Sequence, residues 1–405
     1  MEKCVITSAV RTAVGAYLGS LKTVSTEILA SEILKEVVKR SGVDPDLVDE
    51  IIVGEAVGST PNVARTAALV AGFKEDTPGY TIDLQCGSGL QAVVSASRQI
   101  AAGDADVIIA GGTENMSRSP YYLPISSRYE GLRLGDKILL DSFKYITSFD
   151  YAPIPGQEFE KSSMGLTAEK VAEKYNISRE AQDKFALDSQ LKTAAAISSG
   201  KFKDEILPIE VKTKKDSFIF DTDEHPRSNS TLEGLAKLKP AFKAGGTVTA
   251  GNASGMNDGA SAVLVMREGK AKELGCKPMC RILSNATVAL DPTVMGLGPA
   301  RAIPKALKKA GLKLGDIDLF EINEAFAAQT LGCLHELGME PGTELYKKVN
   351  VNGGAIALGH ALGNSGTRIL TTLIYELKRR GGKYGVASLC IGGGQGIAMV
   401  IENCD

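Results

Sequence analysis

Short apolar runs alternate with amphipathic stretches along the whole chain. The runs 106–112 (DVIIAGG) and 384–390 (YGVASLC) carry almost no charge, which predicts buried strands. The stretches 26–40 and 301–310 have the apolar spacing of helices that bury one face. Because strands and helices alternate in this way, we expect a layered α/β fold.

This pattern occurs twice. Residues 41–57 (SGVDPDLVDEIIVGEAV) align without gaps with residues 310–326 (AGLKLGDIDLFEINEAF) at a constant offset of 269. In each copy a helix ends at a glycine, a short Asp-containing turn follows, and an apolar strand ends in Glu-Ala. A glycine-containing helix start then leads into one of the two buried strands: Cys86-Gly-Ser-Gly in the first copy and Gly363-Asn-Ser-Gly in the second. The sequence therefore predicts two copies of one α/β unit.

A long segment, about 114–246, separates the two copies. It begins with the loop-like residues 118–124 and contains an aromatic, proline-rich stretch at 145–155. Ser178 is the expected N-cap of a helix within it. The segment is rich in lysines, most of which we expect on the solvated surface, although a few could contact a phosphorylated ligand.

Composition narrows the range of functions. A length of 405 residues is enough for two core units, and a net charge of -2 argues against nucleic-acid binding. The seven cysteines are irregularly spaced and predict neither a disulfide framework nor a metal site. The N-terminus does not read as a signal peptide and no apolar run is long enough to cross a membrane, so we expect a cytoplasmic protein that binds no membrane.

Cys86 is the strongest candidate for chemistry. It lies at a strand-to-helix turn, where the positive end of the helix dipole would lower the pKa of its thiol and favour a nucleophilic thiolate. A buried, inert cysteine is the simpler reading of the residue taken alone. Gly87-Ser-Gly-Leu-Gln-Ala92 also matches the dinucleotide fingerprint, with Glu114 ending the next strand. That match is weak because the fingerprint normally occupies the first βα turn and has no use for the cysteine.

Three further residues could act with Cys86. His360 lies in a glycine-rich loop that would let its ring meet a ligand, whereas we expect His225 and His335 to be exposed. Cys390 ends a buried strand and precedes Gly392 in a glycine run whose backbone N–H groups could bind an anion. Asn323 stands at a strand end, where Gly54 occupies the equivalent position of the first copy, and it could hold a water or donate to an oxyanion. A core histidine, a strand cysteine and a turn asparagine remain the plain alternatives.

Together these motifs resemble the thiolase family over essentially the whole chain. The resemblance rests on Cys86-Gly-Ser-Gly, Cys390-Ile-Gly-Gly-Gly and the two-cysteine pattern they form. It is strengthened by five other motifs: 111–117 (GGTENMS), 164–169 (MGLTAE), 249–259 (TAGNASGMNDG), 323–326 (NEAF) and 359–360 (GH).

The resemblance implies a duplicated five-layer αβαβα fold with an inserted loop domain. Residues 1–113 would form the first part of the N-terminal half and 114–246 the inserted loop domain. Residues 247–270 would close the N-terminal half, and 271–405 would form the C-terminal half. A homodimer or homotetramer is also implied.

The resemblance also implies coenzyme A thioester chemistry, with acyl-CoA molecules as substrates and no further cofactor. Cys86 would be acylated, His360 would activate it, and Cys390 would remove the α-proton of the second acyl-CoA. Asn323, through a water, and His360 would form one oxyanion hole; the backbone N–H groups of Cys86 and Gly392 would form the other. The residues that match coenzyme A or acyl-pocket positions are Arg227, Ser254, Met164, Phe242, Met295, Ala325 and Phe326.

The expected reaction is the reversible condensation of two acetyl-CoA into acetoacetyl-CoA and CoA through acetyl-Cys86. Short-chain members typically carry His where Ser163 stands, a CoA-contacting Ser is replaced by Gly234, and residues 144–162 form a longer segment. A 3-ketoacyl-CoA thiolase of broader chain length is therefore the alternative, and a non-catalytic acyl-CoA carrier is a more distant one. We also expect Cys86 and Cys390 to lie close enough for a disulfide that reversibly inactivates the protein.

Overall fold

The structure is a computed structural model that describes residues 3–58, 60–143, 163–214 and 216–404. The proline-rich stretch at 145–155 and the long segment 144–162 lie outside the described residues. The strands are β1 (Cys4–Thr12), β2 (Gly15–Ala16), β3 (Glu50–Gly54), β4 (Gly79–Ile82), β5 (Val107–Asn115), β6 (Tyr121–Tyr122), β7 (Leu140–Asp141), β8 (Ile206–Leu207), β9 (Ile209–Lys212), β10 (Ser217–Phe220), β11 (Asn257–Arg267), β12 (Cys280–Ala289), β13 (Leu319–Ile322), β14 (Tyr384–Ile391) and β15 (Gln395–Asn403). The α-helices are α1 (Thr26–Ser41), α2 (Val63–Ala71), α3 (Ser88–Ala102), α4 (Ser126–Tyr129), α6 (Met164–Lys174), α7 (Arg179–Ser198), α8 (Leu232–Ala236), α9 (Glu268–Glu273), α10 (Gly298–Ala310), α11 (Ala327–Leu337), α12 (Ala355–Leu358) and α13 (Leu362–Arg380).

One mixed sheet carries the duplication. Its strand order is β13-β14-β15-β12-β1-β11-β5-β3-β4, with β2 and β8 paired beside this path. Counted outward from the junction of β12 and β1, the halves have the same pairings: two antiparallel contacts followed by a parallel one. The counterpart of β4 in the second half is a single parallel bridge between Phe320 and Val349. The predicted duplication is therefore confirmed, and β1–β12 pairing joins the two halves.

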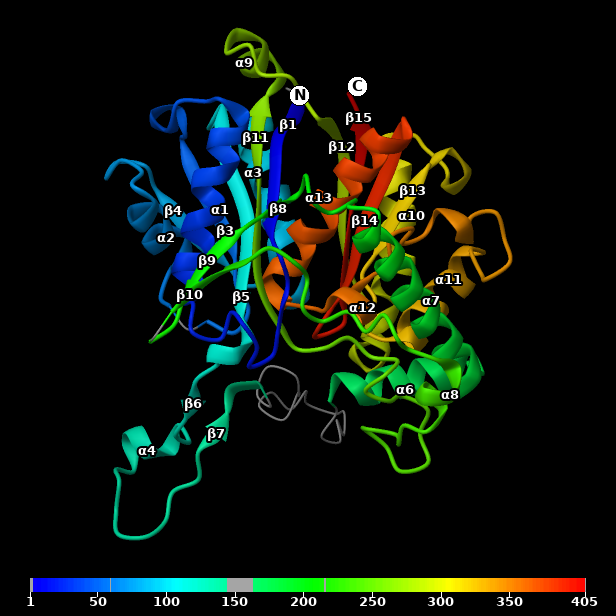
Figure 1. Cartoon of the computed structure of the whole chain (residues 1–405). Coiled ribbons are helices and arrows are strands. Elements are labelled where there is room, and N and C mark those ends of the chain that lie inside the picture. Colours follow the sequence, from blue (N-terminus) through cyan, green and yellow to red (C-terminus); the bar gives the residue numbers. More distant parts are fainter. Residues whose placement is uncertain (1–2, 59, 144–162, 215, 405) are drawn as a thin grey trace.

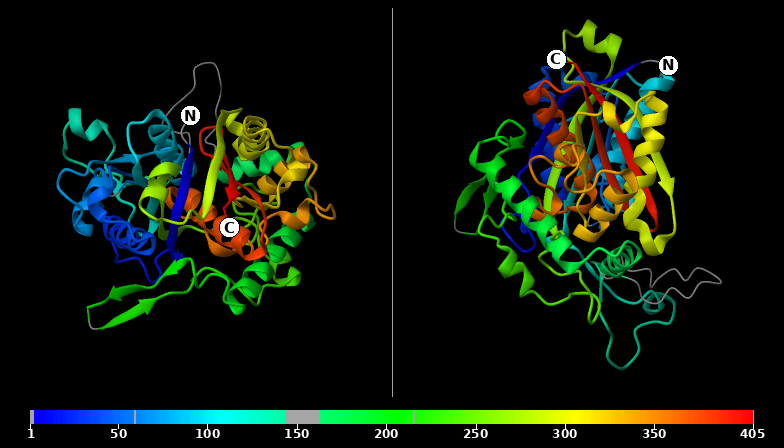
Figure 2. Two further views of the ribbon diagram at one scale, coloured as in Figure 1. Left: turned by 90° about the horizontal axis from the view of Figure 1, so that it is seen from above. Right: turned by 90° about the vertical axis from the view of Figure 1, so that its right-hand side faces the viewer.

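Helices form three layers around the two halves of the sheet (Figures 1 and 2). Helix α1 packs on the outer face of β1, β11 and β5, with α2 beside it. Helices α3 and α13 pack on each other between the two halves, and α10 covers β12, β14 and β15 on the other outer face. The expected five-layer order is confirmed, whereas the domain boundaries at 113, 246 and 270 remain predictions.

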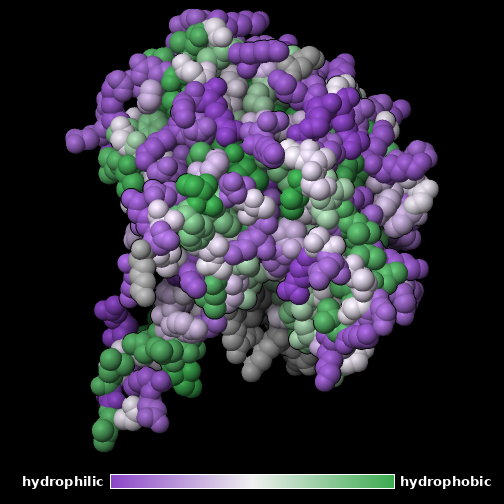
Figure 3. Space-filling model, viewed as in Figure 1, coloured by the Kyte–Doolittle hydropathy of each residue, from purple (hydrophilic) through white to green (hydrophobic). Residues whose placement is uncertain are grey.

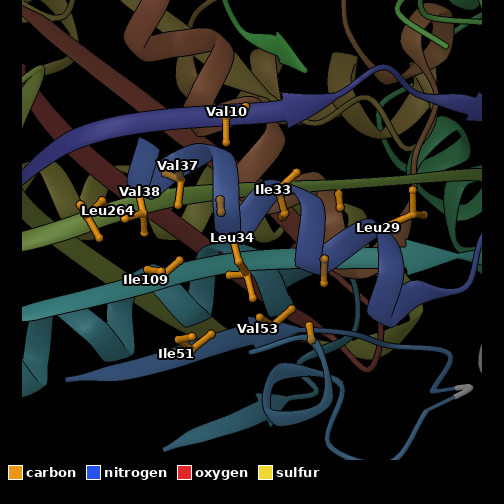
Figure 4. Close-up of a cluster of buried hydrophobic side chains, with 14 of the residues drawn as sticks. Val10, Leu29, Ile33, Leu34, Val37, Val38, Ile51, Val53, Ile109 and Leu264 are labelled. Atoms are coloured by element: carbon orange, nitrogen blue, oxygen red, sulfur yellow. The ribbon is translucent and has the colours of Figure 1, made fainter. Parts of the chain in front are cut away.

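The helix α1 shows why the apolar pattern dictates this packing. Leu29, Ile33, Leu34 and Val37 recur at helical spacing, are fully buried, and face strand residues such as Ile109 (Figure 4). Gly42 ends the helix in the left-handed conformation (φ 71°), where its N–H bonds to the carbonyls of the last turn. Burial of each such side chain contributes roughly 1.5–3 kcal/mol.

Two glycines let the middle helices approach the sheet closely. A Cβ on Gly54, the last residue of β3, would lie 2.4 Å from the backbone of Ser88 at the start of α3. A Cβ on Gly112 in β5 would lie 2.1 Å from the carbonyl oxygen of Gly363 at the start of α13. These contacts bring the first turns of both middle helices to one edge of the sheet. Strand β5 runs further than the expected 106–112 segment and ends at Asn115.

Besides β8 and the β9–β10 hairpin, which pack on the first half, the described segment between the halves has two parts. Helices α6 and α7 pack against the second half, where α6 contacts α11 and α7 contacts α12, and α8 packs on α7. Ser178 caps α7 as predicted, since its side-chain oxygen accepts a hydrogen bond from the N–H of Ala181 at 3.2 Å. The second part is an arm formed by β6, α4 and β7, which extends away from the layered body (Figure 1).

Candidate active site

Cys86 lies in a tight turn between β4 and α3. The turn is a short 3₁₀ segment, Gln85–Gly87, in which Gln85 has φ 51°, an uncommon conformation for a residue with a side chain. Ser88 supports it, because its hydroxyl donates to the carbonyl of Gln85 at 2.6 Å and accepts from the N–H of Leu84 at 2.8 Å. The turn thus holds Cys86 just before the first turn of α3. Backbone strain of this kind is common at functional sites.

The thiol of Cys86 is more basic than the sequence suggested. Its pKa is raised to about 11, mainly because the side chain is desolvated, although the backbone N–H of Gly392 donates to the sulfur and opposes this shift. Cys86 packs against an apolar cluster that includes Val57, Met116 and Leu362. The expectation of a lowered pKa is therefore wrong, since the cost of desolvating the thiolate exceeds the gain from the helix end.

Cys390 and Gly392 reach the same place from the second half. Cys390 lies near the end of β14 and is 1% exposed, and Cys86 is one of the groups that raise the pKa of its thiol, after burial itself. Gly393 and Gly394 have φ 85° and 80°, so a glycine run is needed for the turn that follows. This turn brings the N–H of Gly392 to the Cys86 sulfur, so the two cysteines, far apart in the sequence, are neighbours.

His360 is held by contacts on three sides. Its backbone N–H donates to Asn257 Oδ1 at 2.9 Å, its Nδ1 lies 2.6 Å from Ser365 Oγ, and its Nε2 lies 3.4 Å from Asn323 Nδ2. The ring is 5% exposed, and burial, followed by the positive charge of Arg368, lowers its pKa to about 4. His360 is therefore a neutral imidazole at physiological pH.

Asn323 follows β13 and comes close to His360. It is 1% exposed, and its Oδ1 has no hydrogen-bond partner among the described residues. A buried polar atom without a protein partner is typical of a place where a water or a ligand binds. Gly54 could not carry the equivalent side chain, because the backbone of Ser88 occupies that space. Only the second copy has room for a polar group here.

An apolar wall adjoins these groups. Met295, Ala325 and Phe326 belong to one buried cluster with Cys390, and Met164 packs against it. The Phe242 ring meets Phe326 edge to face, with centroids 5.9 Å apart. The backbone N–H of Ser254 donates to the carbonyl of Ala325 at 2.9 Å, which brings the 249–259 motif to the same wall. Four of the residues assigned here by sequence thus share a cluster with Cys390, and Phe242 and Ser254 adjoin that cluster through Phe326 and Ala325.

Arg227 lies at a separate cavity of about 290 Å³. Gly234, Leu238, Ala250 and His225 also line it, and the backbone N–H of Arg227 donates to Gln190 Oε1 at 2.8 Å. His225 is only partly exposed, because its ring packs against Gly255. This burial, followed by the charge of Arg227, lowers the pKa of His225. The expectation of an exposed His225 is therefore wrong; His335 is exposed as predicted.

The glycines of the dinucleotide fingerprint have a packing role. A Cβ on Gly89 would lie 2.6 Å from the carbonyl oxygen of Gly363 and 2.8 Å from Thr367 Oγ1. Gly89 therefore allows α3 and α13 to pack closely, and this surface leaves no space for a pyrophosphate.

Sequence reasoning missed several residues that support the site. Ser365 and Asn257 hold His360. Both lie inside motifs recognised in the sequence, Gly363-Asn-Ser-Gly and 249–259, but neither residue was itself given a role. Glu114 accepts hydrogen bonds from the N–H groups of Ala56, Val57 and Gly363 and so ties the start of α13 to the first half. Burial and the nearby Glu55 raise the pKa of Glu114 to about 8. Only its strand-end position could have signalled this role.

The described residues show neither a metal site nor a membrane-spanning helix. Across 3–58, 60–143, 163–214 and 216–404, no group of three or more His, Cys, Asp or Glu side chains could hold a metal ion. No helix in this part of the chain combines the length and apolar character needed to cross a bilayer.

Comparison with known proteins gives one family. Residues 4–269 match the thiolase N-terminal domain and residues 276–403 the thiolase C-terminal domain. Acetyl-CoA acetyltransferases of Syntrophomonas wolfei and Escherichia coli K12 are each 49% identical to this chain, with 99% of both chains covered. The crystal structure of the Bacillus anthracis acetyl-CoA acetyltransferase superposes with TM-score 0.93 at 47% identity, covering 100% of this chain and 99% of that one. Human mitochondrial 3-ketoacyl-CoA thiolase gives 0.93 at 44% identity, with 99% of both chains covered. The chain belongs to the thiolase family.

Proposed function

We propose that this thiolase is an acetyl-CoA C-acetyltransferase, which reversibly condenses two acetyl-CoA into acetoacetyl-CoA and CoA. The observation that carries the proposal is the approach of the Cys86 and Cys390 thiols, together with the contact between Asn323 and His360, which lies two residues before Leu362 in the cluster that packs on Cys86. Full-length relatives with 46–49% identity bear the name of this activity. Acetyl-CoA is both donor and acceptor, and no cofactor beyond coenzyme A thioesters is needed.

The first half-reaction acetylates Cys86. The Cys86 proton moves to His360 Nε2 while the sulfur attacks the thioester carbonyl, and the coenzyme A thiolate that leaves takes the Cys390 proton. The products are acetyl-Cys86, free coenzyme A, a His360 imidazolium and a Cys390 thiolate. Holding the acetyl group covalently makes the second step effectively unimolecular.

The second half-reaction forms the carbon–carbon bond. The Cys390 thiolate removes a methyl proton from the second acetyl-CoA, and the resulting enolate carbon attacks the carbonyl of acetyl-Cys86. The Cys86 sulfur leaves and takes back the proton from His360. Developing oxyanions are met by His360 with an Asn323-bound water at one carbonyl and by the N–H groups of Cys86 and Gly392 at the other. One such donor contributes about 3–4 kcal/mol.

Intact mass measurement after mixing with acetyl-CoA tests the covalent step. We expect one added acetyl group in the wild type and in Cys276→Ala, which removes a cysteine outside the site. Cys86→Ala should show none. An acetyl group that persists in Cys86→Ala would refute the assignment of the nucleophile.

Chain length is the point on which the alternative differs. Ser163 precedes the α6 motif and Gly234 lines the Arg227 cavity, positions where short-chain members carry other residues. We expect thiolysis of the C4 ketoacyl-CoA to have a higher kcat/KM than that of the C8 and C16 compounds. A preference for C8 would instead identify a 3-ketoacyl-CoA thiolase of broader specificity.

We also infer a homodimer or homotetramer. Ile125, Tyr129 and Ile138 on the arm are 79%, 73% and 73% exposed, and Figure 3 shows apolar side chains gathered there. Exposed apolar area of this kind is typical of a protein contact, and a second copy of the chain fits a soluble metabolic enzyme. Light scattering of Ile125→Asp should show a smaller assembly than wild type. The seven free cysteines favour a reducing compartment, for which we propose the cytoplasm.

A further inference from the structure

We propose that Ser365 is a positioning residue that holds His360 in the tautomer with its proton on Nδ1. In this tautomer Nε2 carries a free lone pair, which is the atom that must accept the Cys86 proton. The inference deepens the function proposed above and rests on it for its kinetic consequence, although the tautomer itself is a property of the resting protein.

The hydroxyl of Ser365 has only one proton, and it is already used. Ser365 Oγ donates at 2.8 Å to the carbonyl oxygen of Ala361, the N-cap residue of α13. The contact of 2.6 Å between Ser365 Oγ and His360 Nδ1 must therefore be a hydrogen bond that Nδ1 donates and the hydroxyl oxygen accepts. All three residues are buried, so water cannot easily replace either partner.

The opposite edge of the ring leads to the same tautomer. His360 Nε2 lies 3.4 Å from the amide nitrogen of Asn323, which can only donate. A lone pair on Nε2 suits this neighbour, whereas a proton there would face another donor. The ring is buried and each of its nitrogens has a close neighbour, while Asn257 fixes the backbone that carries it, so the ring cannot easily turn over.

A neutral partner has a different consequence from a carboxylate. A carboxylate at Nδ1 would stabilise the imidazolium and favour a charged cysteine–histidine pair at rest. Ser365 orients the ring without adding negative charge. The charge that acts on His360 is the positive one of Arg368, which lies on the same helix as Ser365. The Cys86 and Cys390 thiols that adjoin the site are neutral at rest. The His360 ring thus stays neutral until the Cys86 sulfur attacks the thioester carbonyl.

Nitrogen-15 NMR of histidine-labelled protein tests the tautomer directly. The chain has only three histidines, and His360→Gln identifies the signal of interest. We expect a protonated Nδ1 and an unprotonated Nε2 for His360 in the wild type at pH 7. A proton on Nε2 would overturn the proposal, whatever the activity of the protein.

Ser365→Ala tests the consequence, with Thr371→Val as its matched control. Thr371 makes the same kind of bond, from its hydroxyl to the carbonyl of Thr367 one turn back (2.9 Å), and is equally buried, but it does not touch His360. We expect Ser365→Ala to slow acetylation of Cys86 about 10- to 100-fold with little change in KM, and to mix the two tautomers in the NMR spectrum.

Thr371→Val should acetylate at the wild-type rate. Equal rates in Ser365→Ala and wild type would refute the positioning role, as would equal slowing in both variants, which would indicate a loss of helix packing alone. Ser365→Thr, which keeps the hydroxyl, should restore most of the rate. If the wild type itself forms no acetyl-enzyme, the proposed function fails, while the NMR result still decides the tautomer.

Discussion

The protonation state of Cys86 and His360 at rest can be worked out from the structure. The pKa is about 11 for the thiol and about 4 for the imidazolium. Moving the proton from sulfur to nitrogen thus spans about 7 pKa units, or about 10 kcal/mol. For a separation of about 4 Å and an effective dielectric constant of about 20, attraction between the resulting charges returns only about 4 kcal/mol. We therefore expect the ion pair in roughly one molecule in 10⁴.

Absorbance at 240 nm, which reports thiolate, measures this state. The difference between wild type and Cys86→Ser should stay flat from pH 5 to about pH 9 and rise only above it. Alkylation of Cys86 by iodoacetamide, followed by mass, should likewise speed up with pH without a plateau near neutrality. Cys276→Ala, which leaves the site intact, should follow the wild type in both measurements.

A full thiolate step below pH 7 would refute the reasoning. It would mean that the helix end, the Gly392 N–H and His360 together outweigh the desolvation of Cys86. At low pH the rate of Cys86 acetylation depends on a second group, because His360 must be neutral to accept a proton. Acetylation should therefore fall as pH drops toward about 4, and His360→Ala should abolish this fall.

Three further predictions concern other parts of the molecule. Gly112→Ala should push the start of α13 away from β5, costing about 1–3 kcal/mol in urea unfolding and slowing acetylation, whereas Gly315→Ala, with open space at its Cβ, should do neither. The fully buried Arg11 pairs with Asp223 at 2.7 Å and with Glu205 at 2.6 Å. Asp223→Asn removes one of these two negative partners and should lower the free energy of unfolding by about 3–5 kcal/mol. Asp46→Asn, in the exposed pair with Lys74, should lower it by less than about 1 kcal/mol. Peroxide should link Cys86 to Cys390 reversibly, but slowly at pH 7 because both thiols are protonated; peptide mapping that finds no 86–390 cross-link would reject the disulfide.

Much of the fold was predictable because periodicity and repetition report burial directly. The gap-free match of 41–57 with 310–326 corresponds to β3 and β13 at equivalent positions of the sheet, and the apolar spacing of 26–40 corresponds to α1. Glycine at 42 and 311 marked both helix ends, where the backbone takes the left-handed conformation. The arm was not predicted, because its short strands and exposed apolar residues follow no regular period.

The site was predictable as a set of residues but not as an electrostatic environment. Cys86, His360 and Asn323 stood out because each is a reactive or polar group in a small-residue turn. Their pKa values depend on how completely neighbours from the other half exclude water, which no local pattern encodes. His225 shows the same limit, since its contact with Gly255 comes from a loop that is remote in the sequence from its polar turn.

The pairing of β1 with β12 joins two halves of one chain, and each half supplies one of the two reactive sulfurs. Cys86 belongs to the turn before α3 in the first half and Cys390 to the end of β14 in the second, and the exposed stretch around Gly275 connects the two halves covalently. A polypeptide nicked there should still carry out its chemistry if the fragments remain associated, and neither fragment alone should hold an acetyl group and abstract a carbon-bound proton. Catalysis by this protein should therefore require that its two halves assemble correctly.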